Sequence, residues 1–232
     1  MTIHGLNKTT LLDYPGHLAA TIFTGGCNFR CPFCHNASLV RDPASQPTIP
    51  EEEIFSFLKK RRGILEGVCI TGGEPTLAPD LADFVKKIKD LGLLVKLDSN
   101  GYKPDVLHAL LKDDLLDCIA MDIKNAPARY GETVGIPDLD ITPILRSVDL
   151  IRNSNIPFEF RTTLVKEFHS EEDVLAIGEW LRGVPAYFLQ SFIDSHDILM
   201  PGCHAHDDKT VFRFRDLLIP MIPSVQVRGL SE

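Results

Sequence analysis

The sequence lacks long apolar runs. Its 232 residues contain no stretch of eighteen or so consecutive apolar residues, so no membrane-spanning helix is expected. The first ten residues, MTIHGLNKTT, lack the charged start and apolar stretch of a secretory signal. Cysteines that form no disulfides are typical of proteins in a reducing compartment. These absences predict a cytoplasmic protein that makes no membrane contact.

The chain also has few cysteines and no excess of positive charge. Six cysteines in a chain of this length do not make a disulfide framework. Three are scattered, at Cys69, Cys118 and Cys203, and three are clustered in the run GCNFRCPFCHN. The formal net charge is −8, which argues against a general nucleic-acid binder. A globular enzyme with one cysteine site is the class that remains.

No internal repeat, low-complexity tract or composition break marks a second domain, and strand-like and helix-like segments alternate. Strands are predicted at 17–23, 67–71, 94–98, 117–123, 158–165, 186–192 and 225–227. Helices are predicted at 51–62, 81–91, 104–112, 142–153, 171–182 and 210–219. We therefore expect one domain over residues 1–232, with a core at about 15–192 and a C-terminal extension at 193–232.

This alternation predicts an α/β fold with a parallel sheet and right-handed crossovers. A doubly wound sheet would gather polar residues at one switch point. Here they follow at least four successive strands, which is where a barrel places its working residues. The pattern therefore favours a partial (β/α)6 barrel of the TIM type.

The three clustered cysteines, Cys27, Cys31 and Cys34, have the spacing C-x3-C-x2-C. Three thiolates on one loop can hold three irons of a 4Fe-4S cube and leave the fourth iron open. The alternative is a zinc site with His35 or a distant residue as fourth ligand. Zinc sites usually have two cysteine pairs, or a cysteine pair and a histidine pair, and no second pair is present. The cluster is favoured, with His35 as a hydrogen-bonding neighbour.

At this point the sequence resembles the radical S-adenosylmethionine (SAM) enzymes, whose signature is C-x3-C-x-aromatic-C. Phe33 fills the aromatic position before Cys34. The resemblance implies that the open iron is chelated by the amino and carboxylate groups of SAM, with Phe33 against the adenine. It also implies reductive cleavage of SAM to methionine and a 5′-deoxyadenosyl radical. In such enzymes the protein positions the cofactor and excludes solvent.

Two further segments match that family. Gly72, Gly73 and Glu74 resemble its GGE motif at the end of the second strand, which implies contact with the methionine ammonium of SAM. The segment Asp98-Ser99-Asn100 resembles one that contacts the amino-acid and ribose parts of SAM in related activating enzymes. Each has an ordinary alternative. The first is a strand-to-helix turn, and the second is an Asx turn that ends a strand.

The likeness narrows to the activating enzymes of glycyl-radical enzymes, and is closest to the group that activates anaerobic ribonucleoside-triphosphate reductase. It rests on runs that span about residues 5–192, among them DYPG at 13–16, DCIAMDIK at 117–124, FRTTLV at 160–165 and YFLQSF at 187–192. The resemblance implies a glycyl-radical enzyme as protein substrate and a flavodoxin- or ferredoxin-like electron donor. Larger activating enzymes carry further cysteine pairs in a ferredoxin-like module, which this chain lacks.

Other residues leave alternatives open. Lys124 can face the cofactor or pair with Asp122 as a structural ion pair. His169 can approach the ribose or simply precede the helix that begins after Ser170. Arg161 and Gln190 can reach a substrate cavity or point outward. The segment 200–206, MPGCHAH, matches nothing familiar and is expected to be a solvent loop rather than a second metal site.

Three functions are therefore weighed. The first is a glycyl-radical-enzyme activase, acting on anaerobic ribonucleotide reductase or on a partner of the pyruvate formate-lyase type. The second is a radical SAM enzyme that acts on a small molecule such as a deazapurine precursor. The third is a metal- or cluster-bearing binding protein without catalysis, in which the segments 72–74 and 98–100 would have no purpose.

Overall fold

The computed structural model describes residues 1–194 and 197–230. The chain divides into two compact units, which are described separately. Unit 1 comprises Met1–Asn28, Ser38–Ala120 and Pro143–Pro157, and unit 2 comprises Phe29–Ala37, Met121–Thr142 and Phe158–Glu232. No helix in the described part of the chain is long and apolar enough to cross a membrane.

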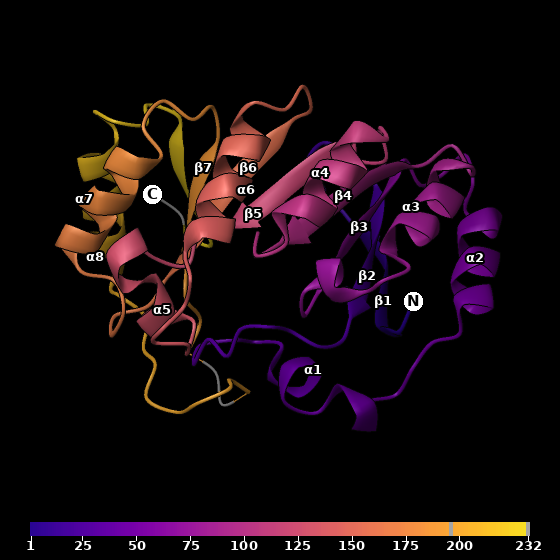
Figure 1. Ribbon diagram of the computed structural model, residues 1–232, viewed down its shortest axis with the longest axis horizontal. Helices are drawn as coiled ribbons and strands as arrows, with labels where there is room; N and C mark the ends of the chain where they lie inside the picture. Colours follow the sequence, from indigo (N-terminus) through magenta and orange to yellow (C-terminus); the bar gives the residue numbers. More distant parts are fainter. Residues whose placement is uncertain (195–196, 231–232) are drawn as a thin grey trace. The chain divides into compact units, whose positions relative to one another are not determined.

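The fold is mixed α/β with an eight-stranded sheet, and the strand order is the order of the chain (Figure 1). The strands are β1 (Ile3–Thr10), β2 (Ala19–Thr24), β3 (Gly67–Gly72), β4 (Leu94–Ser99), β5 (Cys118–Asp122), β6 (Phe158–Leu164), β7 (Tyr187–Ser191) and β8 (Val225–Arg228). The helices are α1 (Ala37–Arg41), α2 (Glu51–Lys60), α3 (Leu81–Lys89), α4 (Pro104–Lys112), α5 (Tyr130–Thr133), α6 (Thr142–Arg152), α7 (Glu171–Trp180) and α8 (Asp208–Leu218).

In unit 1, strands β2, β3 and β4 run parallel, and β1 pairs antiparallel with β2. The middle of β3, Val68–Ile70, is apolar and fully buried. Such runs are typical of parallel strands that are covered on both faces. Helix α2 begins with Glu51–Glu53 and ends with Lys59 and Lys60, so its charges complement the helix dipole.

In unit 2, strands β6, β7 and β8 run parallel. Helices α7 and α8 contact each other, and α8 also contacts β7 and β8. Helix α7 starts with a capping box, in which Ser170 Oγ accepts the Asp173 N–H and the Asp173 carboxylate accepts the Ser170 N–H. The helix expected after Ser170 is therefore present.

Every strand and helix expected from the sequence is present, with ends that differ by a few residues. The expected helix at 210–219 spans Asp208–Leu218, because Asp207 caps it by accepting the Thr210 N–H. The strand β1 was not expected. Its run IHGLNKTT has few apolar residues, since an antiparallel edge strand exposes much of its length.

Candidate functional site

Two predicted segments of unit 1 meet at the ends of β2 and β3. The Gly73 N–H donates to Thr24 O at 2.8 Å, and the Glu74 N–H donates to Gly26 O at 2.8 Å. A Cβ on Gly73 would lie 1.9 Å from Gly26 O, well inside any permitted contact. The glycines of the GGE segment therefore allow the backbone to lie directly against the start of the cysteine loop.

The Glu74 side chain joins the ends of β3 and β4. Its carboxylate is buried and accepts four hydrogen bonds: from Thr76 N at 3.1 Å, Thr76 Oγ1 at 2.5 Å, Ser99 Oγ at 2.9 Å and Asn100 N at 2.6 Å. Burial raises the pKa of Glu74, and the four donors oppose that rise. The predicted segments 72–74 and 98–100 are thus one connected network.

Asn100 extends this network to the first cysteine. Its Nδ2 lies 3.8 Å from Cys27 Sγ and donates to Asn28 Oδ1 at 2.8 Å. Its Oδ1 accepts the Tyr102 N–H at 2.9 Å, so the expected Asx turn is also present. Asp98 accepts from the buried Lys96 ammonium at 2.5 Å. Asn100 therefore serves both the turn and the cysteine loop.

In unit 2, Cys31 and Cys34 lie at the two ends of a tight turn, closed by Cys34 N donating to Cys31 O at 3.1 Å. The Phe33 ring is buried, with its centroid 5.7 Å from that of Phe168 and 6.4 Å from that of His169. His35 stacks on Phe192 at 5.0 Å, and burial lowers its pKa. The aromatic position of the motif is thus fixed by neighbouring rings, and contact of Phe33 or His35 with SAM stays a prediction.

Lys124 interacts electrostatically with both cysteines of this turn. Its ammonium donates to Asp122 Oδ2 at 2.9 Å, and Asp122 also accepts from Arg161 Nε at 3.1 Å. Although burial opposes both shifts, the opposite charges hold the pKa of Asp122 below and that of Lys124 above its usual range. Burial raises the pKa of Cys34, and the Lys124 charge opposes that rise. The expected Asp122–Lys124 pair is present. The Lys124 cation in it interacts electrostatically with the Cys31 and Cys34 thiols.

His169 is buried and joins two strand ends. Its Nδ1 accepts the Val165 N–H at 3.0 Å, which makes Nε2 the protonated nitrogen, and Nε2 donates to Lys124 O at 2.8 Å. Burial lowers the pKa of His169 to about 4, so the ring is neutral at pH 7. Both ring nitrogens are thus engaged within the protein, and the ribose contact stays a prediction.

The donor set fits the implied cluster. Cys27, Cys31 and Cys34 are not joined in disulfides. The Lys124 ammonium can stabilise negative charge on Cys31 and Cys34, and the Asn100 side-chain amide can do so on Cys27. Across the described ranges, no three His, Cys, Asp or Glu side chains converge into a ready-made metal site. The cluster and its three ligands are therefore carried forward as part of the proposal below.

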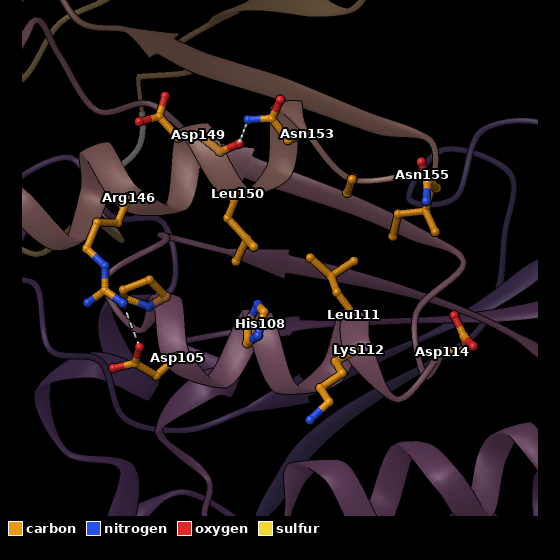
Figure 2. A pocket seen from close by; sticks show the side chains of 13 residues that line it. Asp105, His108, Leu111, Lys112, Asp114, Arg146, Asp149, Leu150, Asn153 and Asn155 are labelled. Carbon is orange, nitrogen blue, oxygen red and sulfur yellow. Dashed lines mark hydrogen bonds and ion pairs between the residues drawn. The ribbon is translucent and has the colours of Figure 1, made fainter.

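A cavity of about 710 Å³ between α4 and α6 lies away from this chemistry (Figure 2). Arg146 pairs with Asp105 at 2.7 Å across it, and His108, Leu111 and Leu150 also line it. None of the residues predicted to hold the cluster or SAM belongs to its lining.

Sequence analysis missed some members of these networks. Asn28, directly after Cys27, accepts a hydrogen bond from Asn100 through its Oδ1. Thr76 donates two hydrogen bonds to Glu74. Glu159, two positions before Arg161 in a buried strand, lies on the same face as Arg161 and forms an ion pair with it at 3.8 Å. Two opposite charges at that spacing in the run FEFRTTL were a signal that could have been used.

Comparison with known proteins agrees with this arrangement. Residues 21–181 match the family model of the radical SAM superfamily. The chain is 34% identical over 194 residues to a "putative glycyl-radical enzyme activating enzyme" of Methanocaldococcus jannaschii, covering 82% of this chain and 79% of that protein. It is 27% identical over 194 residues to the pyruvate formate-lyase-activating enzyme of Staphylococcus epidermidis, covering 78% and 76%.

Solved structures show the same fold. Streptococcus suis SuiB aligns with a TM-score of 0.68 at 13% identity over 91% of this chain, which spans about half (49%) of SuiB. The structure of anSMEcpe with bound AdoMet and a peptide aligns with a TM-score of 0.63 at 16% identity, covering 88% of this chain and 61% of that one. The expected partial-barrel architecture is therefore confirmed. The chain belongs to the radical SAM superfamily and, within it, to the activating enzymes of glycyl-radical enzymes.

Proposed function

We propose that this protein installs a glycyl radical in a partner enzyme, and that the partner is an anaerobic ribonucleoside-triphosphate reductase. The observation that carries the activase assignment is the 34% identity to the M. jannaschii protein over most of both chains. The choice of reductase rests on the resemblance of the strand-end runs, such as DCIAMDIK at 117–124.

In this proposal Cys27, Cys31 and Cys34 hold a 4Fe-4S cluster, and SAM lies against the strand ends that carry Gly72–Glu74, Asp98–Asn100 and Lys124. When bound, the two groups supply an adenosyl radical that takes a hydrogen atom from a glycine α-carbon. The protein's own part is to hold the thiols, orient SAM and keep water away. The Glu74 network and the Lys124 ammonium supply the orientation.

The exposure of one face of β6–β8 favours a protein as the substrate. Parallel strands are normally covered on both faces. In β6, Phe160, Thr162 and Leu164 are fully buried, whereas Arg161 and Thr163, on the opposite face, remain partly exposed. Phe188 and Gln190 of β7 lie beside them in register and are also partly exposed. A partly open face of a parallel sheet suits an occupant that is not part of this chain.

The chemistry of that face suits a peptide. A row of paired charges begins at Lys124 and continues through Asp122, Arg161 and Glu159. Arg228 ends the row, bound to both Glu159 oxygens at 3.0 and 2.7 Å. Its guanidinium also lies 3.4 Å from the Phe188 ring centroid. The Gln190 carboxamide, opposite Thr163, can donate to and accept from a main chain. The row therefore leads from Lys124 across β6 to Arg228 of β8.

The test is anaerobic reconstitution followed by incubation with SAM, a reductant and the purified reductase. We expect a glycyl doublet in electron paramagnetic resonance, formed together with 5′-deoxyadenosine. Cys31→Ala in this chain, or Gly→Ala at the target glycine of the partner, should abolish the doublet. Deoxyadenosine without a doublet on any partner would instead favour the small-molecule hypothesis. If no deoxyadenosine forms, the remaining hypothesis is a cluster- or metal-bearing binding protein without catalysis.

A second candidate partner is pyruvate formate-lyase, because relatives from Staphylococcus epidermidis and Clostridium pasteurianum are named as its activating enzymes. The same assay with both partners decides between them. A doublet on the lyase alone would overturn the choice of reductase and keep the activase assignment.

A further inference from the structure

The segment Met200–His206, expected to be a solvent loop, is bound at both ends. Within it, Gly202 has a φ of +91°, which favours glycine and turns the chain. At one end, the Met200 N–H donates to Pro32 O at 2.9 Å, and Pro32 lies between Cys31 and Cys34. The segment therefore contacts the cysteine turn itself.

At its other end the segment is tied to the residues that follow β6. The Lys166 N–H donates to His204 O at 2.9 Å, and Ala205 bridges to Val165. Glu167 accepts from His204 twice, from N at 2.9 Å and from Nδ1 at 2.7 Å. These bonds make one side of the segment a short extension of the sheet.

His206 completes the attachment. Its Nε2 donates to His169 O at 3.0 Å, and its ring packs edge-on against Phe214 of α8 at 5.1 Å. The rings of His169 and Phe168 also pack against the Phe33 ring. The turn at Cys31–Cys34 is thus held from two directions, at Pro32 O and at the Phe33 ring, and both supports lead to the segment at 165–169.

A turn held in this way is ordered before any ligand binds. Fixing a residue in one backbone conformation costs about 1–2 kcal/mol, so a loop that is already fixed loses less on binding. The cysteine turn has its own hydrogen bond, from Cys34 N to Cys31 O, but that bond does not orient the turn relative to Lys124. Met200 and His206 supply fixed points outside it.

We propose that Met200–His206 is a brace that holds the Cys31–Cys34 turn in its ligand-binding conformation. The Met200 amide contacts the turn at Pro32 O. His206 is a positioning residue, which anchors the brace to His169 O. The proposal uses the proposed function only in taking Cys31 and Cys34 as cluster ligands, because the contact exists in the protein chain alone.

The test is hydrogen exchange of the full-length chain without cluster or partner, followed on peptides that contain residues 31–36. His206→Ala removes the donor to His169 O, and His206→Gln keeps an N–H donor at similar reach. We expect about fivefold faster exchange of the turn in His206→Ala, the factor for one lost hydrogen bond, and near-normal exchange in His206→Gln. Thermal unfolding of the whole chain should change little in either variant.

A second pair tests the contact directly. Met200→Pro removes the N–H that binds Pro32 O, whereas Met200→Ala removes only the side chain. Iron release from the reconstituted protein to a chelator should be several-fold faster in Met200→Pro than in Met200→Ala. Unchanged exchange at 31–36 in His206→Ala, with faster exchange at 200–206 itself, would overturn the brace whether or not Met200→Pro folds. Because these measurements need no partner, failure of the activase assay would leave their outcome intact.

Discussion

The Glu74 carboxylate accepts the backbone N–H of Asn100 at 2.6 Å, although 26 positions separate the two residues in the sequence. The same carboxylate binds Ser99 Oγ and two groups of Thr76. The acidic residue of the GGE segment therefore stabilises the strand ends from within. Because the Glu74 side chain is engaged within the protein, we predict that this segment contacts SAM through its backbone.

Replacing Glu74 should cost stability. In Glu74→Gln the new NH2 must face one of the four donors, which leaves a buried donor without an acceptor. We expect the free energy of unfolding to fall by about 1–3 kcal/mol in urea titrations at pH 7. Glu52→Gln, a change on the exposed side of α2, is the matched control and should stay within about 0.5 kcal/mol of the wild type. Equal stability of the two variants would contradict the network.

Acid should weaken the fold through His169. Its pKa is about 4 in the folded state, below the ordinary 6.5, so the unfolded chain binds the proton more tightly. The stabilisation contributed by neutral His169 is present above pH 6.5 and is lost as the pH falls toward 4. This loss is about 3 kcal/mol. Urea titrations at pH 7 and pH 4 should show a smaller pH dependence in His169→Gln. An unchanged dependence would mean that His169 titrates normally.

The close approach at Gly73 makes a sharp prediction. Gly73→Ala places a Cβ 1.9 Å from Gly26 O, so the backbone of the GGE segment or of the cysteine loop must move. We expect SAM binding, measured by calorimetry on the reconstituted protein, to weaken at least tenfold. Gly63→Ala is the control, because Gly63 has open space around it, although its φ of +81° is positive. It should lose about 1 kcal/mol of stability from backbone strain and keep its SAM affinity.

The three clustered cysteines, unlike the scattered ones, should be needed for cluster assembly and for cleavage of SAM. Cys31→Ala should fail to give the brown cluster absorbance and the cleavage of SAM. Cys69→Ala, a change inside the buried strand β3, should keep both. Full SAM cleavage by Cys31→Ala would remove Cys31 from the set of ligands.

The open face of β6–β8 predicts a separable effect on the partner. Gln190→Leu should raise KM for the partner protein about tenfold, because it removes the carboxamide that we propose binds the partner's main chain. Partner-independent SAM cleavage should change little. Gln46→Leu, at a half-buried loop position of unit 1, should alter neither quantity. A normal KM in Gln190→Leu would exclude this face from substrate recognition.

Much of the site could be predicted from the sequence because its residues lie in short local patterns. The cysteine spacing, the glycine pair before Glu74 and the Asn100 turn each depend on a few neighbouring positions. The Asp122–Lys124 pair could be proposed for the same reason. The bonds from Glu74 to Asn100 and from His206 to His169 could not, because they join residues that are 26 and 37 positions apart.

The sequence by itself determined the α/β alternation, the cysteine motif and the family, because periodicity and motif spacing are local properties of the chain. Only the tertiary structure decided how those parts are held. It placed Glu74 inside a hydrogen-bond network, occupied both nitrogens of His169, and bound the segment 200–206 to the cysteine turn. The physical reason is that hydrogen bonds between distant segments depend on the meeting of strand ends in space, which no local pattern records.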